Sequence, residues 1–275
     1  MASVKFGFIG AGNMGSALAR AVCKSIGPDS VLISDKSQVK AKLLAEELKC
    51  SYADNNAVAS EAKFIFLGVK PQMMADMLSS IKPVLEGRSD RFVLISMAAG
   101  LSISSLNKML GSKMPIIRIM PNTPVAVGKG MLLYTNSDLV FMDEIGEFCD
   151  ALKFAGKIDR INEELIDAAS ALSGCGPAFV YLFAEALSDA GVECGLQRAK
   201  ALEYAAQTLS GAAELLLTSS KHPGQLKDEV CSPGGSTIAG VHSLEESAFR
   251  GTVMNAVRAS FERTKELGCA EDEND

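Results

Sequence analysis

A glycine-rich segment near the start of the chain constrains the fold more than any other part of the sequence. Residues 10–15 read Gly-Ala-Gly-Asn-Met-Gly, a GxGxxG pattern that follows an apolar strand candidate and opens a helical pattern. In such a unit Gly10 permits a tight turn, Gly12 lets a pyrophosphate approach, and Gly15 lets the helix pack on the strand. The segment, with Asn13 and Met14, therefore predicts a dinucleotide site. The alternative is a strand–turn–helix without a ligand.

The first half of the chain alternates short apolar runs with helical patterns. The strand candidates are 4–9, 31–34, 64–69, 92–97 and 116–120, and helical segments separate the first four. Strands buried on both faces read as continuous apolar runs, and this alternation is typical of βαβ units. We therefore expect an α/β fold, in which residues 1–160 form a Rossmann domain with a doubly wound, mostly parallel sheet.

The second half reads as helices alone. The segments 165–172, 178–187, 199–217 and 249–267 carry apolar residues at helical spacing, and no convincing strand follows Asn162. We expect an all-α domain over 161–268 and a short acidic, disordered tail over 269–275.

The predicted helix over 199–217 is apolar around much of its circumference. Such a helix must be buried nearly all round. In so small a domain this favours a subunit interface, and the alternative is a central core helix of a monomer.

Composition excludes several classes of protein. The net charge of −6 gives no basic footprint for nucleic acid or an anionic membrane. No apolar run reaches the roughly 18 residues that a membrane-spanning helix needs, and the N-terminus enters a strand pattern without a signal peptide. Seven cysteines without a CxxC motif, and only two histidines, predict reduced thiols, a cytoplasmic location and no metal site.

The end of the second strand candidate bears on the choice of dinucleotide. Asp35 follows Gly15 at the distance where an acid usually accepts from the ribose 2′-hydroxyl and selects NAD. Ser34, Lys36 and Ser37 at the same corner are suited to a 2′-phosphate instead. Both NADH and NADPH therefore remain open at this point.

Loops follow the next three strand candidates at the carboxyl edge of the predicted sheet, where open α/β sheets bind ligands. The residues concerned are Val69, Lys70 and Pro71, then Ala98 and Ala99, and then Asn122 and Thr123. We expect these loops to line the nicotinamide half of the site. Lys70 is either a cofactor ligand or an ordinary solvated charge.

A second glycine-rich stretch, Cys231–Gly240, lies far from the first. Gly234 and Gly235 leave backbone N–H groups uncovered, and Ser236 and Thr237 open an apolar-periodic helix. A helix start with bare donors suits a small anion such as a carboxylate. The alternative is an ordinary Pro-Gly-Gly turn with a Ser or Thr cap.

The catalytic motifs that the sequence lacks argue against several types of reaction. No Ser-His-Asp grouping or HExxH motif is present, and His222 and His242 are placed as structural residues. A hydroxyacid dehydrogenase of similar layout needs an acid or base, commonly a lysine after the domain boundary, and residues 161–199 contain no lysine. Reduction of a C=N bond is less demanding, because an iminium is already electrophilic and the protein mainly positions the reactants.

These motifs resemble the pyrroline-5-carboxylate reductase family over nearly all of residues 4–267. The most specific matches are His222–Asp228 and Val230–Gly240, with support from 69–71, 98–100, 120–124 and 172–178. The resemblance implies reduction of 1-pyrroline-5-carboxylate to L-proline by NADPH or NADH. It also implies a homodimer through the helical domain, in some members assembled as a decamer of five dimers.

The resemblance also assigns roles to residues. The substrate carboxylate would meet the turn formed by Ser232, Gly234, Gly235 and Ser236, and the Thr237 hydroxyl would hydrogen-bond the ring nitrogen. Glu163 matches a position near the substrate, and Asn55 matches a position that contacts the cofactor. Asp35 stands where relatives that prefer NADPH carry a small polar residue, and Glu229 stands where some carry Asn. A dinucleotide-binding regulatory protein without turnover is the rival from another class.

Overall fold

The structure is a computed structural model that describes residues 4–272. The chain forms two compact units. The first comprises the chain up to Cys175 together with the segment from Ser260 onward, and the second is Gly176–Ala259. This division falls inside the predicted helical domain, because the helix over Glu163–Ser173 packs on the sheet through the fully buried Ile166.

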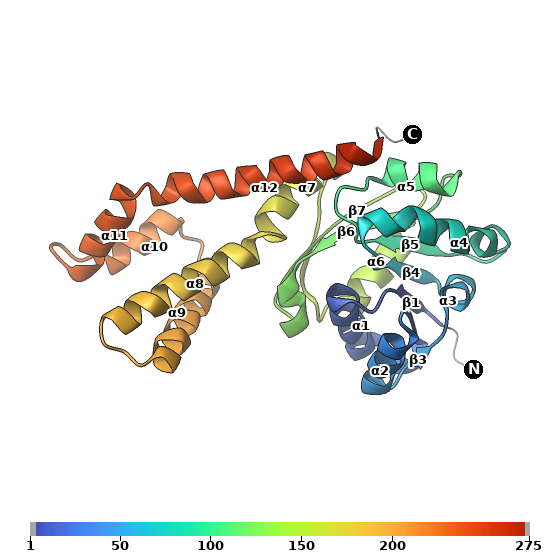
Figure 1. Ribbon diagram of the computed structural model, residues 1–275, viewed down its shortest axis with the longest axis horizontal. Helices are drawn as coiled ribbons and strands as arrows, with labels where there is room; N and C mark the ends of the chain where they lie inside the picture. The colour runs from blue at the N-terminus through green and yellow to red at the C-terminus, as the bar shows by residue number, and fades with distance from the viewer. Residues whose placement is uncertain (1–3, 273–275) are drawn as a thin grey trace. The chain divides into compact units, whose positions relative to one another are not determined.

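An eight-stranded sheet organises the first unit (Figure 1). Its strands are β1 (Phe6–Ile9), β2 (Val31–Ser34), β3 (Ser51–Tyr52), β4 (Phe64–Leu67), β5 (Val93–Ser96), β6 (Ile116–Pro121), β7 (Gly130–Asn136) and β8 (Gly156–Arg160). The spatial order is β3-β2-β1-β4-β5-β6-β7-β8, and only the β6–β7 pair is antiparallel. The order reverses between β1 and β4, so the crevice beyond these two strands is the expected ligand position in a doubly wound sheet.

Helices cover both faces of this sheet. They are α1 (Asn13–Ile26), α2 (Gln38–Leu48), α3 (Asn55–Glu61), α4 (Met74–Glu86), α5 (Ile103–Leu110), α6 (Met142–Ala151) and α7 (Glu163–Ser173). Buried residues of α1, α2 and α6 share one core cluster, whereas those of α3, α4 and α5 share another. The predicted mostly parallel, doubly wound sheet is confirmed.

Paired phenylalanines hold the centre of the sheet together. Phe6 and Phe64 are register partners with ring centroids 4.8 Å apart, and Phe8 and Phe66 are partners at 4.4 Å. Stacked rings of this kind stabilise neighbouring strands beyond the area that they bury. The β1–β4 pair, from whose ends the two central loops emerge, is therefore a rigid support.

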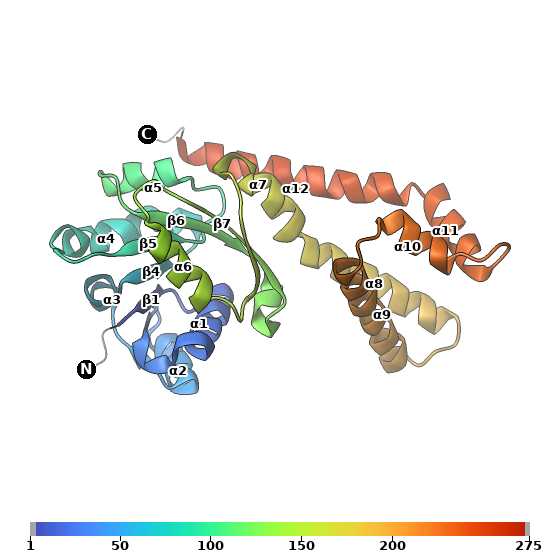
Figure 2. The ribbon, with the colours of Figure 1, turned by 180° about the vertical axis from the view of Figure 1, so that it is seen from behind.

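Helices alone make up the second unit. They are α8 (Gly176–Glu193), α9 (Arg198–Thr218), α10 (Pro223–Val230), α11 (Ser236–Glu246) and the first part of α12 (Phe249–Asp272). Figures 1 and 2 show α8 and α9 side by side as a hairpin. The segment predicted as a disordered tail needs a correction, since α12 continues to Asp272; residues 273–275 lie outside the described part of the chain.

Helix α9 is not a core helix of this chain. Only Ala201 and Ala205 are buried on it, while Leu202 is 50% and Leu217 is 77% exposed. The alternative of a central core helix in a monomer is therefore wrong, whereas the expected burial of α9 in a subunit interface stays a prediction.

One stretch corrects the expectation that no segment could span a membrane. Glu163–Glu193, which joins α7 and α8, is long and apolar enough by length and composition alone, with a mean hydropathy of 1.3. Only 17% of its most apolar window is buried. Most of this apolar window is therefore exposed in the single chain.

Candidate active site

The glycine loop lies between β1 and α1 and has the geometry that a pyrophosphate requires. Gly10 has φ +111°, and a Cβ there would lie 2.5 Å from the Gly68 carbonyl oxygen; a Cβ at Gly15 would lie 2.1 Å from the Gly10 carbonyl oxygen. A Cβ at Gly12 would meet nothing within 4 Å. Two glycines are thus needed for packing, and the third keeps open space where a phosphate would approach.

No side chain caps the start of α1, whose N-cap residue is Gly12. The first-turn N–H groups, which include those of Asn13, Met14 and Gly15, therefore remain available at the positive end of the helix. An anion bound there would be held by the backbone, so the loop fits the pyrophosphate of a dinucleotide.

A groove of about 800 Å³ adjoins this loop. It is lined by Ile9, Gly10, Gly12, Asp35, Lys36, Lys40, Asn55, Gly68, Val69, Lys70, Gln72, Met73, Asp76 and Met77. Seven of the predicted cofactor residues are therefore brought together from the ends of β1, β2 and β4 and from α3. Sequence reasoning missed Lys40, Gln72, Met73, Asp76 and Met77. Lys40 could have been found, because it lies in the first turn of the helix that begins just after Lys36.

Asp35 uses both carboxylate oxygens within the chain. Oδ2 accepts from the Ala11 N–H at 2.7 Å, and Oδ1 accepts from the Ser37 N–H at 2.8 Å. The carboxylate thus joins the glycine loop to the turn that follows β2. A ribose hydroxyl would have to share oxygens that the backbone already occupies.

Ser34, predicted as a cofactor residue, makes its polar contacts inside the chain. It is completely buried, and its hydroxyl lies 2.8 Å from Asn55 Oδ1 and 3.2 Å from the Phe8 carbonyl oxygen. Ser34 therefore orients Asn55, which lines the groove at the start of α3, and does not itself face the groove.

The other predicted loops lie outside the set of groove-lining residues. Ala98 is buried, while Ala99 and Thr123 are exposed. Pro71 begins the short 3₁₀ helix Pro71–Met73 directly after Lys70. Both polar atoms of the Asn122 side chain bond within the chain: Nδ2 donates to the Ser173 carbonyl and Oδ1 accepts from the Met131 N–H, both at 2.9 Å.

In the second unit, the loop between α10 and α11 has the predicted open donors. Gly234 has φ +69°, and Gly235 is the N-cap of α11 without any side-chain cap. A Cβ at Gly235 would lie 2.3 Å from Ser232 Oγ, so a larger residue there would require the exposed Ser232 side chain to move. Ser236 and Thr237 are exposed in the first turn of α11. The loop can therefore present N–H groups and hydroxyls to a small carboxylate.

Three other residues named in the sequence analysis have clear contacts. Glu163 Oε1 accepts from the Ile103 N–H at 2.7 Å and lies 3.4 Å from Arg118. His222 caps α10, where Nδ1 accepts from the Gly224 N–H at 3.1 Å. Glu229 pairs with Lys221 at 2.6 Å. His222 is thus a structural residue, as the sequence indicated.

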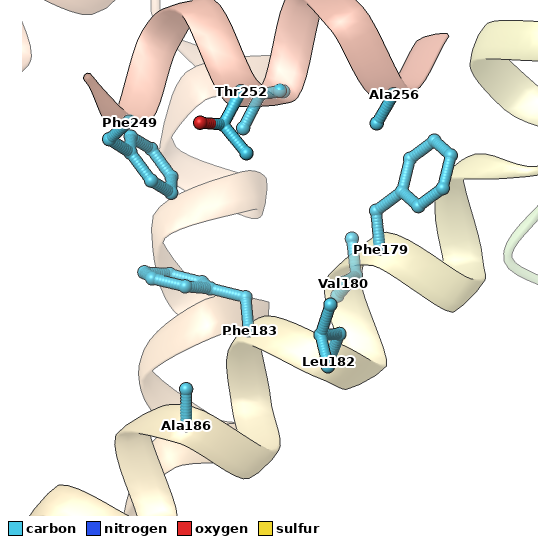
Figure 3. Close-up of a pocket in the computed structure, with 9 residues that line it drawn as sticks. Phe179, Val180, Leu182, Phe183, Ala186, Phe249, Thr252 and Ala256 are labelled. Atoms are coloured by element: carbon cyan, nitrogen blue, oxygen red, sulfur yellow. The ribbon is translucent and has the colours of Figure 1, made fainter. Parts of the chain in front are cut away.

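An apolar pocket of about 400 Å³ also lies in the second unit (Figure 3). Its lining comes from α8 and α12 and consists of Phe179, Val180, Leu182, Phe183, Ala186, Phe249, Thr252, Val253 and Ala256. The Phe183 and Phe249 rings face each other at 5.8 Å. With one hydroxyl among nine residues, this pocket suits packing by another apolar surface rather than recognition of a polar substrate.

Comparisons with known proteins agree with both halves of this description. The family model described as pyrroline-5-carboxylate reductase dimerisation matches residues 163–267, and the one described as NADP oxidoreductase, coenzyme F420-dependent, matches residues 5–100. Pyrroline-5-carboxylate reductase of Pisum sativum is 40% identical over 267 residues, covering 96% of each chain. The Escherichia coli enzyme of that name is 38% identical over 96% of this chain and 98% of its own.

Solved structures show the same likeness. The pyrroline carboxylate reductase of Plasmodium falciparum, determined with NADP bound, superposes with a TM-score of 0.85 at 38% identity and covers 98% of this chain and 99% of its own. The reductase of Coxiella burnetii gives 0.87 at 29% identity over 96% of this chain and 98% of its own. With this identity over nearly its whole length, the chain belongs to the pyrroline-5-carboxylate reductase family.

Proposed function

We propose that this protein is an oxidoreductase that reduces the C=N bond of 1-pyrroline-5-carboxylate to give L-proline, the last step of proline biosynthesis. The observation that carries the proposal is the pairing, in one chain of this family, of an open pyrophosphate loop at Gly12 with an uncapped carboxylate loop at Gly235. One loop suits a dinucleotide and the other suits a small carboxylate substrate.

The site residues act mainly by positioning. NADPH or NADH, when bound, supplies the hydride from C4 of the nicotinamide ring. The bare N–H groups at the start of α11, with Ser232 and Ser236 beside them, hold the substrate carboxylate. The Thr237 hydroxyl orients the ring nitrogen. No side chain has to remove a proton from carbon, because the iminium is electrophilic and solvent can protonate the product amine.

NADPH is the preferred reductant in this proposal. Asp35 is engaged by two backbone N–H groups, so it is poorly placed to select the ribose 2′-hydroxyl of NADH. Lys36, Lys40 and Lys70 line the same groove, against the two acids Asp35 and Asp76. Lysine ammonium groups beside the β2 corner favour a 2′-phosphate.

The exposed apolar side chains of the helical unit support the proposal of a homodimer. Apolar side chains stay exposed along α8 and α9, among them Tyr181, Leu182 and Leu202. The matching family region is described as a dimerisation region, and it includes the Leu182 pocket. We infer that a second copy, not a lipid bilayer, covers these faces, and that dimers associate further into a decamer. We also propose that the enzyme is cytoplasmic and that neither a membrane nor a nucleic acid is its partner.

The decisive experiment follows NADPH absorbance after addition of 1-pyrroline-5-carboxylate to the purified protein, and identifies L-proline as product. The same assay with NADH gives the cofactor ratio, and a panel of 3-hydroxy acids with NADP tests the dehydrogenase rival. Steady oxidation of NADPH with formation of proline is expected. Absence of turnover with either cofactor, while the dinucleotide still binds, would instead favour a regulatory binding protein.

A further inference from the structure

Arg118 is a buried cation in the middle of the β6 strand. Its side chain is only 3% exposed. A buried guanidinium is tolerated when carboxylates pair with it. Both partners come from α7: Nη2 lies 2.6 Å from Asp167 Oδ1, and Nη1 lies 3.4 Å from Glu163 Oε1. Glu163 and Asp167 are four residues apart, so they lie on one face of the helix.

The Glu163 carboxylate makes a second contact that extends this ion pair to a loop. Oε1 accepts from the backbone N–H of Ile103, the first residue of α5, at 2.7 Å. Residues 98–102 connect β5 to this position, and Ser102 caps α5 by accepting from the Ser105 N–H. The chain therefore links Arg118, through Glu163, to the end of the loop that follows β5.

A second polar contact holds the other end of α7. Asn122 Nδ2 donates to the carbonyl of Ser173, the last residue of that helix. Arg118, Met120 and Asn122 alternate along one side of the strand and its extension. Met120 packs with Ile166 between the two polar contacts. The residues after β5 and β6 are thus fixed to one helix at two points with an apolar contact between them.

We propose that Arg118 is a positioning residue for the reductase reaction, which holds the loop 98–102 through Glu163 at the nicotinamide half of the cofactor site. The inference rests on the proposed function. Loops at the carboxyl ends of β5 and β6 flank the crevice where doubly wound sheets bind the reactive half of a dinucleotide. Small displacements there reduce the rate strongly, because hydride transfer needs donor and acceptor in contact.

The test compares Arg118→Met with Arg91→Met. Arg91, which is 39% exposed, makes a two-bond ion pair with the buried Glu144 before the amino-terminal end of β5, so its loss breaks an ion pair of the same unit away from the proposed site. We expect Arg118→Met to lower kcat roughly 10- to 100-fold. The dissociation constant of 2′,5′-ADP, which occupies only the adenosine half of the site, should change by less than about twofold. Arg91→Met should lower Tm but change kcat by less than about twofold.

Arg118→Lys covers the case in which Arg118→Met does not fold, since a lysine can still pair with one carboxylate. An intermediate loss of kcat is expected for it. Wild-type kcat in folded Arg118→Met or in Arg118→Lys would overturn the inference, and so would a parallel loss of affinity for 2′,5′-ADP. An equal loss of kcat in Arg91→Met would also overturn it. Absence of activity in the wild-type protein would refute the proposed function itself, so the two failures can be told apart.

Discussion

Thr237 is the side chain that carries the most specific substrate contact in the proposed reaction. It is exposed in the first turn of α11, beside N–H groups that no side chain caps. Loss of one hydrogen bond in a closed site costs about 1–3 kcal/mol. Thr237→Ala should therefore lower kcat/KM roughly 10- to 100-fold, since about 1.4 kcal/mol corresponds to a factor of ten.

The measurement is the initial rate of NADPH oxidation over a range of substrate concentrations. Thr237→Ser, which keeps the hydroxyl, is the matched control and should retain most of the wild-type rate. Wild-type kinetics in Thr237→Ala would exclude the assigned role.

The charge of Lys40 should distinguish NADPH from NADH, because only NADPH carries a 2′-phosphate. Lys40 lies in the first turn of α2 and lines the groove together with Lys36, which precedes that helix. A charge-assisted hydrogen bond contributes about 1.5–3 kcal/mol. Lys40→Ala should therefore raise the KM for NADPH roughly tenfold or more and change that for NADH by less than about twofold.

Lys42→Ala provides the control on the same helix, because Lys42 is exposed and pairs with Glu46 away from the groove. Its kinetics should match those of the wild type with both cofactors. An equal rise in the two KM values of Lys40→Ala would contradict a 2′-phosphate contact.

At the residue scale, the positions of Asp35 and Ser34 could be predicted from the sequence, but their hydrogen-bond partners could not. Their positions at the end of β2 were predictable from the spacing after the glycine loop. Their contacts were not, because Ala11 and Asn55 reach this corner only after the sheet has formed. A local pattern assigns a residue to a corner of the fold, but the backbone donors that compete for its side chain come from distant segments.

The Arg91–Glu144 ion pair joins the segment just before β5 to the first turn of α6. Arg91 Nε and Nη2 each donate to a Glu144 oxygen at 2.8 Å, and Glu144 also accepts from the Phe141 N–H at 2.9 Å. Burial opposes ionisation of Glu144, but the Arg91 and Phe141 hydrogen bonds outweigh it and lower its pKa.

A carboxyl group whose pKa is lower in the folded state stabilises the fold above its unfolded pKa, about 4.3 for Glu. That contribution is lost as the pH falls through the folded pKa. Glu144→Gln should therefore lower the free energy of unfolding by about 1–3 kcal/mol at neutral pH, and by progressively less below about pH 4. Urea unfolding across this pH range measures the difference, and a difference independent of pH would contradict the assignment.

At the scale of elements, continuous apolar runs predicted β1, β2, β4, β5 and β6 correctly. The edge strand β8 (Gly-Lys-Ile-Asp-Arg) escaped prediction because its polar side chains are largely exposed, so it carries no apolar run. Two-residue β3 is too short for any periodicity. The Met131–Tyr134 run in β7 was an available signal that went unused. Arg118 was another, since a lone cation within Ile-Ile-Arg-Ile-Met predicts a buried charge that needs partners.

At the scale of the whole molecule, the helical unit is the part whose apolar side chains a single chain leaves largely exposed. Its helices were predictable from their period, but the period cannot say what covers them. Buried side chains on α8 and α9 are few, Ser188, Ala201 and Ala205. Where a folded unit leaves large apolar faces exposed, association can supply the missing burial. The exposed apolar faces and the matching dimerisation family region therefore point to the same requirement, a second copy.

Leu182→Asp tests this requirement directly. Leu182 is 68% exposed on α8 and lines the apolar pocket, so a charge there should leave the folded chain intact but oppose burial against a partner. Light scattering after size exclusion should return the monomer mass of 29.0 kDa for the variant, against a multiple of it for the wild type. Reductase activity should fall with the dimer, if the partner copy completes the site.

Leu43→Asp is the matched control, because Leu43 on α2 is also an exposed leucine, at 61%, but belongs to the other unit. It should keep both the wild-type mass and the wild-type rate. An unchanged mass for Leu182→Asp would remove the α8 face from the interface, and a wild-type protein that elutes as a monomer would remove the dimer altogether. A monomer that retains full activity would show instead that each chain holds a complete site, which would separate assembly from catalysis in this enzyme.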